Sequence, residues 1–138
     1  MKPSLRPGAS RVNRITVGRE RTIGFMGEEA RTYGTPSMIL DIEHTCRELI
    51  IEHADAGEDS VGMEISLRHL APTLLGTWVE ITVTVKAVEG RRVTFDVSAV
   101  DELEPISSGS HTRFVVDVGK TIERLKSKAA KRAATRTP

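Results

Sequence analysis

The sequence contains little of several features that mark particular protein classes. Its 138 residues include one cysteine, Cys46, which excludes an intramolecular disulfide framework and a cysteine-based zinc cluster and suits a reducing cytosol. No apolar run approaches the ~20 residues of a membrane-spanning helix, and the N-terminus lacks the apolar centre of a signal peptide. We therefore expect a cytoplasmic protein without a membrane partner.

Several ligand-binding motifs are also missing. The chain has no Gly-rich phosphate loop and no Gly-x-Ser-x-Gly elbow. His44 and His53 are too far apart for a metal-binding pair at i and i+4 on a helix, and no other ligand pattern is present. We expect neither a metal site nor a bound cofactor.

The net charge is near zero, but the charges are unevenly distributed. The chain has 20 basic and 19 acidic residues, a formal net charge of +1. Residues 1–22 hold six basic groups and one acid, residues 119–138 hold seven and one, and the remainder holds seven and seventeen. The basic ends permit binding to nucleic acid or to an acidic partner, but they lack interleaved aromatics and the body is acidic. We favour solvated ends, with nucleic acid not expected as a partner.

The longest helical pattern covers residues 36–54. Thr35 is a suitable N-cap, and Pro36 occupies a position that tolerates proline. At about 100° per residue, one arc collects the apolar positions, and Glu43 falls at its rim. The other face carries charged and polar groups that we assign to solvent. These are Asp41, His44, Glu48 and Glu52.

After this helix the hydrophobic period changes to two. Apolar residues alternate with polar ones over 61–69, 79–87 and 93–99, and a further strand is expected over 106–118. The short connection at Glu89-Gly90 makes the second and third runs an antiparallel hairpin. Residues 12–23 are expected to form one or two short edge strands. The pattern predicts an α+β domain with one long helix against an antiparallel sheet.

A sheet covered by a single helix leaves apolar surface or a strand edge open. Association of identical chains is the usual way to cover such an edge. We therefore expect a homodimer or a higher homo-oligomer.

Three residues are the first candidates for chemistry. Glu43 lies beside the apolar stripe, where an ionised carboxylate needs a partner unless it reaches water. His69 ends the alternating run 61–69 on its apolar face, so the strand directs it towards the helix, either as a general base or as a structural residue. Thr35 needs no role beyond capping. His111 and Arg113 share one face of the last strand, as a carboxylate- or phosphate-binding pair or as a surface pair.

Taken together, these segments resemble a known family. They are Thr35-Pro-Ser-Met-Ile-Leu-Asp-Ile-Glu43, then Gly-Glu-Asp-Ser-Val-Gly-Met-Glu-Ile-Ser-Leu-Arg-His69, then Val-Glu-Gly-Arg-Arg and Gly-Ser-His-Thr-Arg113. In order and spacing they resemble the fluoroacetyl-CoA thioesterase family of hotdog-fold proteins, over roughly residues 12–118.

The resemblance implies a hotdog fold, in which a long helix is wrapped by an antiparallel sheet, and a homodimer with its sites at the subunit interface. It implies hydrolysis of a small or medium acyl-CoA by a Thr/Glu/His set, which falls on Thr35, Glu43 and His69. It also places substrate contacts on Gly62 and Arg113, and coenzyme A enters as part of the substrate. The alternative is a non-catalytic hotdog module that binds an acyl-CoA or another small ligand.

The resemblance divides the chain into three parts. Residues 1–11 are expected to be a flexible basic arm, 12–118 the hotdog domain, and 119–138 a basic helix or tail. The chain departs from the family's fluoroacetate-specific member in the segment 24–34, which is shorter than the Phe-bearing lid of that member and offers only Phe25 and Tyr33. Pro36, which follows Thr35, stands where that member has glycine and removes a backbone donor. The acyl group is therefore left open.

Overall fold

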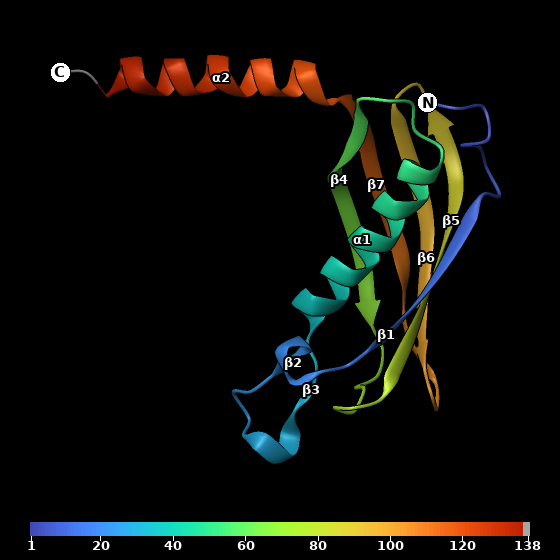
Figure 1. Cartoon of the computed structure of the whole chain (residues 1–138). Helices are drawn as coiled ribbons and strands as arrows, with labels where there is room; N and C mark the ends of the chain where they lie inside the picture. The colour runs from blue at the N-terminus through green and yellow to red at the C-terminus, as the bar shows by residue number, and fades with distance from the viewer. Residues whose placement is uncertain (137–138) are drawn as a thin grey trace.

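The computed structural model describes residues 1–136 and consists of one long helix on a five-stranded antiparallel sheet, followed by a second helix (Figure 1). The strands are β1 (Ser10–Thr16), β4 (Glu58–His69), β5 (Trp78–Glu89), β6 (Arg92–Asp101) and β7 (Pro105–Asp117). They lie in the order β1-β5-β6-β7-β4. Helix α1 (Thr35–Glu52) covers one face of the sheet, and α2 (Val118–Thr135) follows β7. The predicted α+β architecture is confirmed.

The segment before α1 contains only short elements. They are the 3-10 turns η1 (Arg19–Arg21) and η2 (Glu28–Ala30), and the two-residue strands β2 (Thr22–Ile23) and β3 (Thr32–Tyr33), which pair with each other. The expected edge strand is therefore β1 alone, because β2 belongs to a separate two-stranded sheet.

The core lies between α1 and the face of the sheet that α1 covers. Helix residues such as Ile42 and Leu49 are fully buried, as are Ile81 of β5 and Phe95 of β6. Burial of such side chains supplies about 1.5–3 kcal/mol each and is the main force that holds the helix to the sheet. The opposite face of the sheet is largely polar. It carries the alternating Thr82, Thr84, Thr94, Ser98 and Thr112.

Strand β4 contains a β-bulge that the sequence pattern conceals. Gly62 pairs with Arg113 of β7, and the next paired residue is Glu64, so Met63 is an extra residue. Gly62 therefore faces α1, as His69 does, whereas Val61 faces away. The prediction that Val61 to His69 share one face is wrong for the part before the bulge. Bulges bend a strand and re-aim its side chains, and they are frequent near active sites.

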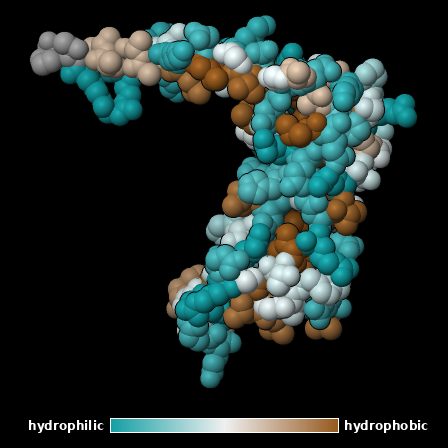
Figure 2. Space-filling model, in the orientation of Figure 1, coloured by the Kyte–Doolittle hydropathy of each residue, from teal (hydrophilic) through white to brown (hydrophobic). Residues whose placement is uncertain are grey.

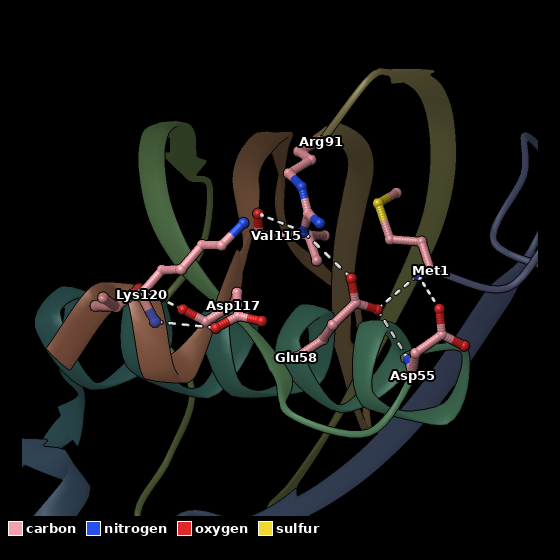
Figure 3. A network of polar contacts seen from close by, with 8 residues as sticks. Met1, Asp55, Glu58, Arg91, Val115, Asp117 and Lys120 are labelled. Carbon is pink, nitrogen blue, oxygen red and sulfur yellow. Dashed lines mark hydrogen bonds and ion pairs between the residues drawn. The ribbon is translucent and has the colours of Figure 1, made fainter. Parts of the chain in front are cut away.

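Residues 1–11, expected to be a flexible basic arm, are mostly exposed but are attached to the body at several points. Leu5 is 4% exposed within the hydrophobic core, and β1 begins at Ser10. The amino group of Met1 donates to Asp55 and Glu58 at 2.6 Å each, and Arg91 donates to the same Glu58 carboxylate (Figure 3). This network connects the N-terminus to the loop after α1, to the first residue of β4 and to the turn before β6.

Helix α2 projects sideways from the end of the sheet, on the side where β4 and α1 lie (Figure 1). Asp117 caps its N-terminus by accepting from the backbone N–H of Lys120 at 2.9 Å. None of its 18 residues is buried. Val118, Ile122 and Leu125 form an apolar stripe along one face and remain 39–60% exposed. Neither helix of the described chain is long and apolar enough to cross a membrane.

Candidate active site

Thr35 and His69 meet at the N-terminal end of α1. Thr35 is the first residue of the helix, and Gly34 occupies the N-cap position, so the expected capping role of Thr35 is wrong. The Thr35 hydroxyl instead lies 2.7 Å from Nδ1 of His69, the last residue of β4. A hydroxyl paired with imidazole is one arrangement that general-base catalysis uses. The structure therefore brings together two of the three residues assigned to catalysis.

His69 is held in a partly apolar environment. Its ring contacts Tyr33 of β3 edge-on, with the centroids 6.4 Å apart. Burial lowers the pKa of His69 from the ordinary value of 6.5. Because the charged form is disfavoured, the imidazole is neutral near pH 7 and can accept a proton from a hydroxyl or a water.

The Thr35–His69 pair opens into a cleft of about 520 Å³. Its remaining walls come from the segment before α1 and from the loop after β4. They are mostly apolar and include Ile23, Phe25, Pro36 and Leu70. Phe25 is 81% exposed at the rim. A cleft with apolar walls and a few polar groups is typical of a small-molecule site.

A second polar cluster lies farther along α1. Oε1 of Glu43 would be only 2.9 Å from a Cβ added at Gly62, with His111 and Arg113 next in distance. Arg113 is 5% exposed and donates from Nε to the Ser60 hydroxyl at 2.8 Å. Burial lowers the pKa of Arg113, and the Glu43 charge opposes this shift. Glu43 therefore has a cationic neighbour, which offsets the cost of placing it at the rim of the core.

His111 bridges the cluster to the backbone and is 1% exposed. Its Nδ1 lies 2.8 Å from the carbonyl oxygen of Glu64, so Nδ1 carries the proton and donates. Nε2 then accepts from Nη1 of Arg113 at 3.2 Å. Burial lowers the pKa of His111, in keeping with this neutral form. The alternative of a surface pair for His111 and Arg113 is wrong, because both side chains are buried.

The two clusters are separated along the helix. Since α1 begins at Thr35, the eight residues to Glu43 span about 12 Å. Within the described chain, the hydrogen bonds of Thr35 and His69 include none to Glu43. One protomer thus presents a hydroxyl–imidazole pair and a separate carboxylate–guanidinium cluster.

For the acyl-CoA hydrolysis that the sequence resemblance implies, Gly62→Ala is expected to lower kcat/KM about tenfold while leaving the fold intact. The added Cβ would meet the far end of the Glu43 side chain, which can rotate away at little cost but then leaves its place beside Arg113. Thiol release from an acyl-CoA and thermal unfolding would be measured together. Ser66→Ala, an exposed position on the same strand, is the control and should change neither quantity.

A buried carboxylate beside the cleft was not expected from the helical pattern. Asp41, assigned to the solvated face, is 8% exposed. It accepts from the Tyr33 hydroxyl at 2.5 Å and from Nε of Arg21 at 3.1 Å. These bonds fasten the segment before α1 onto the helix and fix the ring that contacts His69. The burial of Asp41 could have been predicted only by recognising that the segment 17–34 packs over this face of α1.

Asp41→Ala is expected to destabilise the protein by about 2 kcal/mol, because the buried Tyr33 hydroxyl loses its acceptor and Arg21 its counter-charge. Chemical denaturation would measure the loss. Asp96→Ala, at an exposed site on β6, is the matched control. Equal stability of the two variants would contradict the role given to Asp41.

The described residues 1–136 contain no group of three or more His, Cys, Asp or Glu side chains that could hold a metal ion.

Comparisons with known proteins identify a family for the chain. Residues 17–119 match the family described as fluoroacetyl-CoA-specific thioesterase. The fluoroacetyl-CoA thioesterase of Streptantibioticus cattleyicolor is 29% identical over 135 residues, which are 93% of this chain and 97% of that protein.

Solved structures show the same fold. A hot-dog-like protein from Thermanaerovibrio acidaminovorans superposes with a TM-score of 0.83 at 27% identity, over 91% of this chain and 94% of that one. A mutant of the fluoroacetyl-CoA-specific thioesterase in complex with fluoroacetate and CoA gives a TM-score of 0.78 at 29% identity, over 84% and 98%. The hotdog fold expected from the sequence is confirmed.

Proposed function

Because the chain belongs to the fluoroacetyl-CoA-specific thioesterase family, we propose that it hydrolyses the thioester of a small or medium acyl-CoA. The observation that supports this most directly is the Thr35–His69 hydrogen bond in the apolar-walled cleft. Water adds to the thioester carbonyl, the C–S bond breaks, and the products are the carboxylic acid and the CoA thiol.

Each proposed residue has a chemical task. Neutral His69 accepts through Nδ1 from the Thr35 hydroxyl, so it takes the proton of the attacking water by way of that hydroxyl and returns it to the leaving thiolate. The Thr35 hydroxyl also orients the water. Glu43 either activates the water or attacks the carbonyl itself; in the second route the CoA thiolate leaves, and water then hydrolyses the resulting anhydride to the carboxylic acid and free Glu43. Arg113 and the backbone at Gly62 stabilise the charge that develops on the substrate.

The separation of Glu43 from Thr35 supports a homodimeric site. In a symmetric pair of chains, Glu43 of the partner subunit would complete the Thr35–His69 pair. Surface apolar groups on the proposed contact side support such pairing. Val61 and Met63 on the unpaired edge of β4 are about half exposed, and apolar surface on α2 gathers near its junction with the body (Figure 2). A free sheet edge with exposed apolar groups is typically covered by association.

Mixing two inactive variants tests the shared site. A Glu43→Gln chain and a His69→Ala chain, unfolded and refolded together, would form mixed dimers with one intact site if that site takes its residues from both chains. Random pairing then restores about a quarter of wild-type activity. No recovery in a mixture of confirmed dimers would show that each site lies within one chain.

A panel of acyl-CoA thioesters of increasing chain length, with thiol release as the readout, tests the activity itself. Wild-type turnover that is lost in both Glu43→Gln and His69→Ala would support hydrolysis by these residues. Normal turnover by both variants would contradict the assignment. Thermal stabilisation by CoA esters without thiol release would instead favour the binding-module alternative.

The rate is expected to fall at acid pH. Only neutral His69 has a lone pair on Nδ1 for the Thr35 hydroxyl, and burial lowers its pKa. The kcat/KM profile should therefore rise through an apparent pKa below 6.5 and be flat above it. Burial also lowers the pKa of His111, so protonation of this residue at low pH would destabilise the fold. Unfolding would therefore be followed at each pH, to separate loss of structure from loss of catalysis. An acid limb centred above pH 6.5 would contradict this assignment.

A further inference from the structure

Two buried polar atoms without a hydrogen-bond partner belong to residues paired across β4 and β7, one of which lines the cleft. Among residues 1–136, Nε2 of His69 and the hydroxyl oxygen of Ser107 are the buried side-chain atoms without a hydrogen-bond partner. The two residues are directly opposite each other on β4 and β7. Ser107 is 2% exposed and also pairs with buried Ala99 of β6, so it lies on the face covered by α1.

The spacing permits the two side chains to interact. Directly paired residues in an antiparallel sheet have Cβ atoms about 4.5–5.5 Å apart. A serine hydroxyl reaches an imidazole at this separation by rotation about its Cα–Cβ bond or through one water molecule. Buried polar groups are nearly always paired, so two adjacent unpaired ones on facing residues point to each other as partners.

We propose that the Ser107 hydroxyl accepts from the Nε2–H of His69, and that Ser107 is the positioning residue that sets the tautomer of this histidine. A neutral imidazole has one donor and one acceptor nitrogen. With the proton held on Nε2, Nδ1 keeps its lone pair towards Thr35, at 2.7 Å. The consequence for catalysis rests on the proposed function, whereas the tautomer does not.

Within one chain, the other described groups around His69 cannot take this role. The Tyr33 ring meets the imidazole edge-on, but its hydroxyl is already donated to Asp41. Thr35 is engaged at Nδ1. Within the described chain no carboxylate hydrogen-bonds to His69, so Ser107 stands where many catalytic histidines have an acidic partner.

The tautomer can be read directly by NMR of the histidine ring nitrogens at pH 8. Wild-type His69, assigned by its loss in His69→Gln, should show a protonated Nε2 and an unprotonated Nδ1. Ser107→Ala should shift the population towards protonated Nδ1, and Ser107→Thr, which keeps a hydroxyl, should restore the wild-type pattern. Ser108→Ala, the exposed neighbour on β7, is the control. An unchanged tautomer in Ser107→Ala would overturn the proposal.

Kinetics and stability give a second readout. Ser107→Ala should lower kcat about tenfold with little change in KM, and its melting temperature should not rise. A rise in melting temperature would mean that the hydroxyl is truly unpaired in the wild type, which also overturns the proposal. If the NMR shift appears but the wild type hydrolyses no thioester, the proposed function fails while the Ser107–His69 coupling stands.

Discussion

His69→Ala is expected to reduce kcat for acyl-CoA hydrolysis by about 1,000-fold. The variant leaves the Thr35 hydroxyl without its acceptor and removes the only imidazole that lines the cleft. Thiol release under saturating substrate would measure the effect, with far-UV circular dichroism to show that the fold is kept.

The matched control for this variant is His44→Ala. His44 lies on the exposed face of α1 and does not line the cleft, so its loss should change kcat by less than twofold. If His69→Ala retains more than about a tenth of wild-type kcat, the histidine is not the general base.

Gly109→Ala is expected to destabilise the protein by about 3 kcal/mol, and to lower the melting temperature by roughly 10 °C. Gly109 lies in β7 between β6 and β4, and an added Cβ would be 2.0 Å from the carbonyl oxygen of Ser66. That neighbour is backbone and cannot rotate away, so β4 would have to move from β7. Denaturant unfolding would measure the loss.

Gly119→Ala provides the contrasting glycine. It lies in the first turn of α2, where the nearest atom to an added Cβ is the Asp117 carboxylate at 3.3 Å. Alanine favours a helix more than glycine does, so this change should be neutral or slightly stabilising. Similar melting temperatures for the two variants would contradict the close approach at Gly109.

The main elements could be predicted because their periodicities are local. The helical arc beginning after Thr35 and the alternation over 79–87 and 93–99 both follow from the spacing of apolar residues. The structure places α1 at Thr35–Glu52 and β5 and β6 as an antiparallel hairpin, in agreement with these patterns.

Contacts between elements could not be predicted in the same way. Asp41 looks solvated on a helical projection, and it is buried only because the segment 17–34 folds over it and supplies Tyr33 and Arg21. Ser107 belongs to a run of small polar residues whose sequence does not indicate which of them is buried. Its significance appears only once β7 is paired with β4.

The candidate site was partly accessible from the sequence. His69 was expected to point towards the helix, and the structure brings it to Thr35. Gly62 lies close to Glu43 only because the bulge turns it towards α1. The bulge is not visible in the sequence, since the apolar residues Val61, Met63 and Ile65 alternate without interruption. The catalytic and substrate-binding roles of these residues remain predictions that the variants above would test.

The extra residue at Met63 also determines how many positions separate two residues that face α1 from β4. Gly62 and His69 are seven positions apart, and in a regular strand an odd separation places two side chains on opposite faces. Here the inserted residue restores the parity, so that both face α1. A relative that keeps this glycine and this histidine at a spacing of six or eight must therefore have a straight strand. The number of residues between the glycine and the histidine thus indicates whether the strand of a relative contains the bulge.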